Sequence, residues 1–124
     1  MTTPDELERE HTLQTAVTRY NDLRMREALG EVGLTVEESL QALALGELII
    51  RKAGYGRQLS VRGARSAGAS WAQIGAALGM TRQSAWEAHT RWINYQAEQF
   101  RTTGVAGFDA EQEAQARDLA GDGD

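Results

Sequence analysis

The sequence predicts an all-α fold, and two features of its composition support this prediction. Alanine outnumbers valine and isoleucine together by 19 to 9, which favours helix over strand. The only proline is Pro4, so no proline interrupts a helix in the rest of the chain. A length of 124 residues accommodates one domain with tails. We therefore expect a helical domain in which the 13 glycines mostly end helices or allow close packing.

Residues 1–54 are predicted to form a helical N-terminal segment that is a candidate for dimerisation. A continuous helix is expected from Asp5 to Leu29, because apolar residues recur at helical spacing and Gly30 follows as a stop signal. A second helix is expected to begin at Thr35, where Thr-Val-Glu-Glu forms a capping box. This helix is apolar on more than one face, which indicates either core or an interface between subunits. The pattern of residues 35–67 fits one kinked helix or two.

Residues 70–92, SWAQIGAALGMTRQSAWEAHTRW, carry the most informative pattern in the chain. Ser70 and Gln73 form a second capping box, which marks the start of a short helix. Gly79 is placed to end that helix, and Thr81 is placed to cap the next one. Two helices joined by so tight a turn are typical of the helix-turn-helix.

The small residues of this segment support the same interpretation. Gly75 is small where the two helices should approach each other, and Ala85 occupies the inward position of the second helix. We predict a helix-turn-helix with helices at about 70–79 and 81–100, within a DNA-binding region of residues 55–103. The sequence after Trp92 reads as continuing helix, so no β-hairpin wing is expected.

The net charge of −5 hides an uneven distribution along the chain. Residues 51–92 hold six arginines and Lys52 against Glu87 alone, a net charge of +6, whereas both flanking segments are acidic. A polyanion responds to the surface presented to it, so the basic segment is the candidate for nucleic-acid contact. Arg62 and Arg65 within it fit either an ordinary solvated face or contacts to phosphate.

With these motifs in place, the chain resembles the small actinobacterial-type helix-turn-helix DNA-binding proteins over about residues 59–92, through the phrase ARSAGASWAQIGAALGMTRQSAW. The inward position, usually valine or isoleucine in that family, is alanine here. The resemblance implies that the second helix lies in the major groove of double-stranded DNA. It implies that phosphates lie near Ser70, Gln73 and Thr81. It further implies that bases or backbone are faced by Arg82, Gln83, Ser84, Trp86 and Thr90, with Glu87 as a further candidate. The predicted DNA-binding set is completed by Arg62, Arg65 and Arg91.

The remaining segment, residues 104–124, is predicted to be a disordered acidic tail. It combines glycine, alanine, glutamine and acidic residues, and no apolar face is visible in it.

The sequence offers no chemistry of its own, so we do not expect an enzyme. It has no cysteine and only two histidines, His11 and His89, without a ligand cluster near either, so no metal or other cofactor is expected. No nucleophile motif or phosphate-binding loop is present. The longest apolar stretch, Leu43–Ile50, is too short to span a bilayer, and the N-terminus is acidic where a signal peptide would be basic. We expect a cytoplasmic protein with no membrane partner.

These observations predict a sequence-specific DNA-binding transcriptional regulator that acts as a homodimer through its N-terminal half. Arg82 and Gln83 are expected to read base edges, because arginine suits guanine and glutamine suits adenine. The alternative is a helical interaction module, in which the helix-turn-helix contacts a protein partner.

Overall fold

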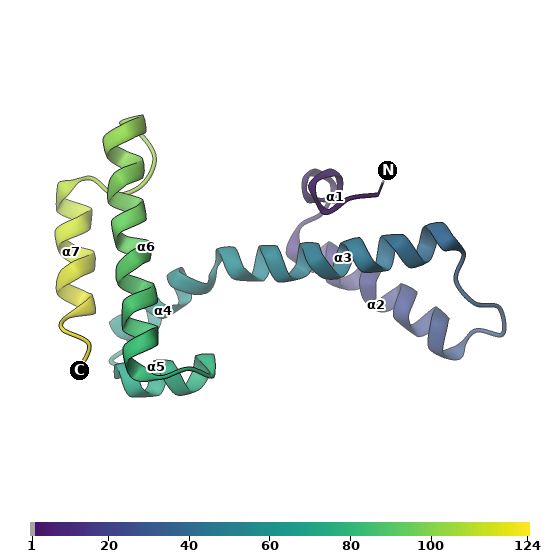
Figure 1. The fold of residues 1–124 in the computed structure, drawn as a ribbon, viewed down its shortest axis with the longest axis horizontal. Coiled ribbons are helices and arrows are strands. Elements are labelled where there is room, and N and C mark those ends of the chain that lie inside the picture. The colour runs from purple at the N-terminus through teal and green to yellow at the C-terminus, as the bar shows by residue number, and fades with distance from the viewer. Residues whose placement is uncertain (1) are drawn as a thin grey trace. The chain divides into compact units, whose positions relative to one another are not determined.

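The computed structural model describes residues 2–124, and every regular element in that range is an α-helix (Figure 1). The helices are α1 (Pro4–Glu10), α2 (Leu13–Leu29), α3 (Val36–Tyr55), α4 (Arg57–Ser66), α5 (Trp71–Leu78), α6 (Arg82–Thr103) and α7 (Ala110–Ala120). The predicted all-α fold is confirmed. Within the described range, no helix combines the length and the apolar character that crossing a membrane requires.

The chain divides into two compact units, an N-terminal unit that ends at Gly56 and a C-terminal unit formed by Arg57–Asp124. The boundary lies two residues from the one expected after residue 54. The sequence predicts one domain with tails, whereas the structure has two compact units, each of which buries an apolar cluster of its own. The open choice for residues 35–67 is decided in favour of two helices, which Gly56 separates.

The N-terminal unit is built on the pair formed by α2 and α3, with α1 packed on α3 (Figure 1). Its core includes Leu7 of α1, Leu23 of α2, and Leu45 and Leu48 of α3. The guanidinium of Arg51 in α3 holds α1 in place through ion pairs with two carboxylates of that helix. The unit is therefore two long helices and one short helix around a narrow core.

The continuous helix expected from Asp5 to Leu29 is wrong, because the chain breaks between Glu10 and Leu13. Thr12 adopts an extended conformation, and its side chain accepts a hydrogen bond from the N–H of Thr15 at 3.2 Å. Threonine makes this local bond only outside a helix, so it starts a new helix here. The break allows Leu7 to reach the core of the unit.

The C-terminal unit contains α4, α5, α6 and α7 around a core that includes Val61, Trp71, Ile74, Ala85 and Ile93. The helix α7 runs antiparallel to α6 and also packs on α4 (Figure 1). The disordered tail expected for residues 104–124 is therefore wrong. Its helix begins at a capping box formed by Asp109 and Gln112, and it buries small residues that give no visible apolar stripe in the sequence, namely Ala116 and Ala120.

Backbone carbonyls at the end of α7 receive side chains from two other helices. The indole N–H of Trp71 donates to the carbonyl oxygen of Ala120 at 2.7 Å. The Nε–H of Arg65 donates to the carbonyl oxygen of Leu119 at 3.1 Å. These bonds satisfy the last carbonyls of α7, which have no partner inside the helix. The packing of α7 is thus specified by groups that lie about fifty residues earlier in the chain.

A matched pair of alanine substitutions tests the packing of α7. Ala116→Asp places a carboxylate in the core and should lower the free energy of unfolding by about 2 to 4 kcal/mol. Ala114→Asp introduces the same group on the exposed side of the same helix and should change it by less than about 0.5 kcal/mol. Urea unfolding followed by tryptophan fluorescence measures both variants. Equal stability of the two would mean that α7 is not docked.

Candidate nucleic-acid interface

Both ends of α5 have the geometry that the capping pattern predicts. The side-chain oxygen of Ser70 accepts a hydrogen bond from the N–H of Gln73 at 3.1 Å, and the side-chain oxygen of Gln73 accepts one from the N–H of Ser70 at 2.8 Å. At the other end Gly79 has a φ of +70°, a left-handed conformation that favours glycine. The N–H of Met80 then donates to the carbonyl oxygen of Gly75 at 2.9 Å. The helix is therefore closed at both ends by local bonds.

The turn after α5 packs directly on Gly75. A Cβ atom at this position would lie 2.8 Å from the carbonyl oxygen of Met80 and 3.0 Å from the backbone nitrogen of Arg82. Real Cβ atoms do not approach backbone atoms this closely, so glycine is required for the turn to fold back on α5. The predicted small position is confirmed, and its neighbour is the backbone of the turn. This contact sets where α6 begins.

The first turn of α6 presents polar side chains to solvent. The side-chain oxygen of Thr81 accepts a hydrogen bond from the N–H of Ser84 at 3.0 Å, as expected for a cap. Arg82, Gln83 and Ser84 are exposed, whereas Ala85 is 1% exposed and points into the core. Arg82 makes no hydrogen bond or ion pair within residues 2–124. The side chain of Gln83 donates to the carboxylate of Glu87 at 3.0 Å.

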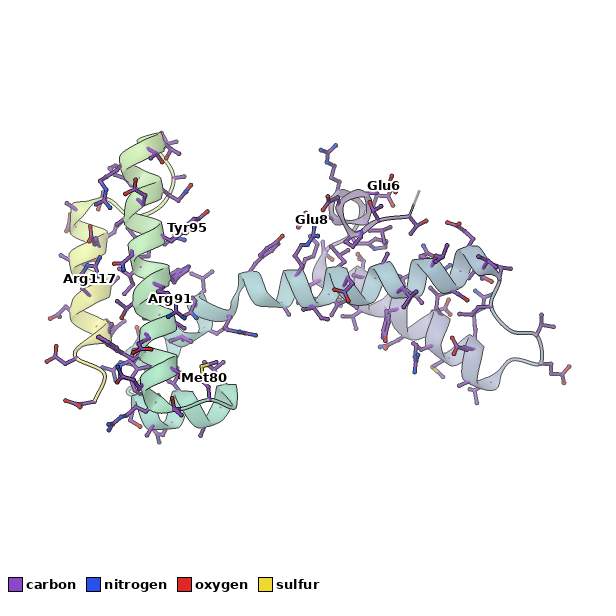
Figure 2. All side chains as sticks on the ribbon, in the orientation of Figure 1. Glu6, Glu8, Met80, Arg91, Tyr95 and Arg117 are labelled. Atoms are coloured by element: carbon purple, nitrogen blue, oxygen red, sulfur yellow. The ribbon has the colours of Figure 1, made fainter. Side chains whose placement is uncertain are left out.

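The exposed face of α6 continues beyond this turn. Ser84, Glu87 and Arg91 follow one another at helical spacing and are all exposed; Figure 2 labels Arg91 midway along α6. Thr90 is half-buried beside them. The residues predicted for the second helix all belong to α6, but Trp86 and Thr90 are half-buried and the others are exposed.

Trp86 is covered by the C-terminal end of the chain. Its indole N–H donates to the carbonyl oxygen of Gly121 at 3.0 Å. Gly123 is buried against its ring, where an added Cβ atom would lie 3.1 Å from ring carbons. Trp86 is expected to face DNA, and in this structure Gly121 and Gly123 pack against its side chain. Nothing in the sequence of a tail without an apolar stripe indicated this contact.

Arg65 has a structural role in place of the phosphate contact considered for it. Its Nε–H and Nη1–H groups donate to the carbonyl oxygens of Leu119 and Ala69, at 3.1 and 3.0 Å. Its guanidinium lies over the ring of Trp71, 5.2 Å from the centroid. Two N–H groups of Arg65 and one face of its guanidinium are therefore engaged in contacts within the C-terminal unit.

Arg62 is likewise directed towards the packing of α7. Its guanidinium lies 5.8 Å from the ring centroids of both Trp92 and Phe108. The two rings meet edge to face at 5.3 Å. Contact with phosphate would require the Arg62 side chain to leave these two rings, so Arg62 is not part of the candidate interface.

His89 is a buried and satisfied residue of the core. Its Nδ1 lies 2.8 Å from the side-chain oxygen of Gln58, and its ring packs between Trp71 and Trp92. Burial, together with the positive charges of Arg62 and Arg65, lowers the pKa of His89 to about 4, so the ring is neutral at neutral pH. Among residues 2–124, no group of three or more histidine or acidic side chains is placed to hold a metal ion.

The basic segment identified in the sequence is divided between the two units. Arg51 and Lys52 belong to the N-terminal unit, where Arg51 pairs with Asp5 at 2.7 Å. Residues 57–92 retain five arginines against one glutamate, a net charge of +4. The exposed arginines of this segment that make no ion pair within the described chain are Arg57, Arg82 and Arg91. The open positive charge is therefore smaller than the sequence count suggested.

Comparison with protein-family models, curated proteins and solved structures finds no significant match to this chain.

The glycine at the contact between α5 and the turn can be tested against a second helical glycine. Gly75→Ala forces a methyl group into the turn backbone and should destabilise the C-terminal unit by about 1 to 3 kcal/mol. Gly63→Ala, in α4, meets open space and should be neutral or stabilise by up to about 1 kcal/mol. Urea unfolding monitored by tryptophan fluorescence distinguishes the two. If both variants were equally stable, the turn would not rest on α5 as described.

Proposed function

We propose that the C-terminal unit binds double-stranded DNA through α5, the turn and α6, and that the protein is a sequence-specific transcriptional regulator. The observation that carries this proposal is the start of α6. Its first turn is capped by Thr81, is held to α5 by the contact at Gly75, and exposes Arg82, which has no partner among residues 2–124. A rigid helix terminus with free hydrogen-bonding groups is what recognition in the major groove requires.

The exposed side chains of this turn suit base edges. Arg82 can donate two hydrogen bonds to O6 and N7 of guanine, and Gln83 can pair with N6 and N7 of adenine. Gln83 now bonds Glu87, so contact with adenine requires that bond to open or Glu87 to join the contact by accepting from cytosine N4. Arg82 carries no such cost, and we assign it the larger share of specificity.

Contacts to the DNA backbone follow from the two helix starts. The N-termini of α5 and α6 carry unpaired N–H groups and the positive end of the helix dipole, which favour phosphate. Ser70 and Gln73 support this role by shaping the start of α5, and Thr81 does so for α6. Arg91 is free to reach phosphate from the open face of α6. These contacts position the protein and carry no sequence information.

Substitutions in the first turn of α6 test base recognition. Arg82→Ala and Gln83→Ala should each flatten the preference at particular base pairs by about 1 to 3 kcal/mol, which is about 5- to 150-fold in affinity. Arg101→Ala is the matched control, because Arg101 is an exposed arginine of the same helix that already pairs with Glu98 at 2.8 Å. Selection from a random DNA library, with the fold of each variant verified by circular dichroism, measures the preference.

The same experiment distinguishes DNA binding from the alternative function. A sequence preference that survives both substitutions would mean that the wrong helix is assigned to the groove. If the intact protein retards no DNA at low salt, the proposal fails and the helical protein-interaction module is favoured. Where binding is observed, Arg91→Ala should weaken all sequences alike and reduce the salt dependence by about one phosphate contact.

The acidic end of the chain should weaken DNA binding, because it lies against the second turn of α6 at Trp86. We predict that Asp122→Asn combined with Asp124→Asn raises affinity at low salt and that the gain disappears as salt screens the charges. Glu111→Gln, at the opposite end of α7, should leave affinity nearly unchanged. Fluorescence anisotropy with a labelled duplex measures the affinity of both variants and of the unmodified protein. A fall in affinity on neutralising Asp122 and Asp124 would contradict this electrostatic account.

A further inference from the structure

The outer face of α3 carries a stripe of exposed side chains, apolar except for Glu47, that residues 2–56 leave uncovered. Val36, Leu40, Leu43, Glu47 and Ile50 follow at alternating intervals of four and three residues. Leu43 is 70% exposed and Ile50 is 68% exposed, although other leucines of the same helix are fully buried. An alternation of four and three residues is the repeat by which one helix packs along another. The helix is therefore prepared for a partner helix on the side that faces away from its own core.

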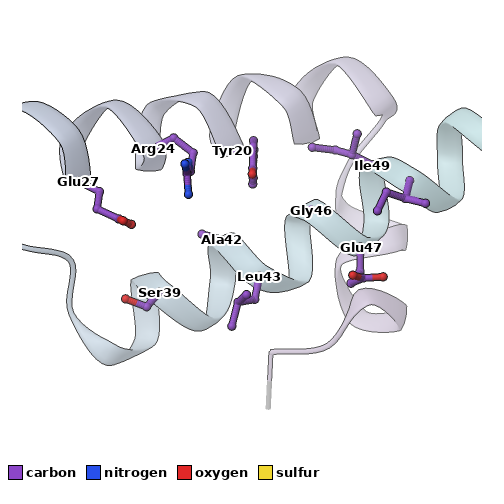
Figure 3. A pocket seen from close by; sticks show the side chains of 10 residues that line it. Tyr20, Arg24, Glu27, Ser39, Ala42, Leu43, Gly46, Glu47 and Ile49 are labelled. Carbon is purple, nitrogen blue, oxygen red and sulfur yellow. The ribbon is translucent and has the colours of Figure 1, made fainter.

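Beside this stripe lies a groove of about 700 Å³ between α2 and α3 (Figure 3). Its apolar lining includes Tyr20 of α2 and Leu43 and Ile49 of α3, and Gly46, which has no side chain, also lines the groove. The same lining contains three charged residues, Arg24, Glu27 and Glu47. None of the three makes an ion pair or hydrogen bond within residues 2–124.

We propose that this face binds a second copy of the chain, with the two α3 helices antiparallel across a twofold axis near residue 45. In this arrangement Leu40 of one copy meets Ile50 of the other, which continues the apolar seam. The two Glu47 side chains are kept apart, whereas a parallel pair would bring them together. Gly46 lies near the axis in sequence, and a side chain at this position would point towards Tyr20 of α2 in its own copy, so the groove is open there.

The charges of the groove identify a second copy as the occupant. An interface with twofold symmetry uses the same surface on both partners, so charged residues within it can pair only if that surface carries both signs of charge. Arg24 and Glu47 lie in one groove and make no ion pair within residues 2–124. In the proposed antiparallel arrangement, Arg24 of one copy approaches Glu47 of the other. A lipid surface is a poor alternative, because the N-terminal unit carries ten acidic residues against six basic ones.

The helices α2 and α3 have 17 and 20 residues, so they are roughly 25 to 30 Å long at 1.5 Å per residue. A specific interface buries roughly 800 Å² per partner, so a stable dimer would require side chains of both long helices. Two copies would form a four-helix arrangement whose core includes the side chains that one copy leaves exposed.

Sedimentation equilibrium of the full chain at about 20 μM tests the proposal without DNA. We expect a species of twice the 13.6 kDa mass of one chain. Leu43→Asp should shift the protein to monomer, since the new carboxylate would be buried in the seam. Leu59→Asp is the control, because Leu59 is also an exposed leucine of a helix but belongs to the C-terminal unit. Circular dichroism should show unchanged helix content in both variants.

A charge exchange provides a second and independent test. Arg24→Glu and Glu47→Arg should each weaken dimerisation at least about 10-fold, and the double variant should restore it. A monomeric wild-type chain at 100 μM overturns the proposal. So does a dimer that withstands Leu43→Asp, or a double variant that fails to regain affinity. Because the association requires no DNA, its failure and the failure of the proposed DNA binding are separate results.

Discussion

The C-terminal unit depends on the burial of one tryptophan between helices that are distant in the chain. Trp71 begins α5, is fully buried, and donates its indole N–H to the last turn of α7 at 2.7 Å. Arg65 covers one side of its ring and His89 packs against it. A buried indole N–H without an acceptor would be costly, so α7 must dock for α5 to hold its position. The position of α5 in turn determines the position of the turn that follows it and of the start of α6.

The two units satisfy their apolar surface in different ways, and this difference organises the proposals. The C-terminal unit closes its core with α7, and the face it leaves open, on α6, is polar. The N-terminal unit has only two long helices and leaves apolar side chains such as Leu43 and Ile50 in water. A large exposed apolar patch indicates an interaction surface. We therefore propose that the C-terminal unit recognises DNA and that the N-terminal unit binds a second copy of the chain.

The sequence predicted those parts of the candidate site that depend on neighbouring residues in the chain, namely the helix caps and the turn. Ser70, Thr81 and Gly79 act within a few residues of their own positions, so caps and the turn are readable without a structure. The functions of Arg65 and Trp86 were not readable, because their partners are carbonyl groups more than thirty residues away. A positive residue in a basic segment looks the same whether it faces phosphate or a helix end. The break at Thr12 was missed because the apolar spacing continues across it.

The sequence by itself determined that the chain is helical, where α5 and α6 begin, and that Gly75 and Gly79 stand at the turn, since helix propensity, capping and glycine geometry act over one or two turns of chain. Only the tertiary structure decided that residues 110–120 fold as a helix. Alanines 116 and 120 offer little apolar surface of their own, and the carbonyls that end α7 are satisfied by Trp71 and Arg65. The same long-range packing decided which arginines remain free. An exposed Arg82 and an occupied Arg65 differ in their neighbours in space, and those neighbours are set by the burial of the core.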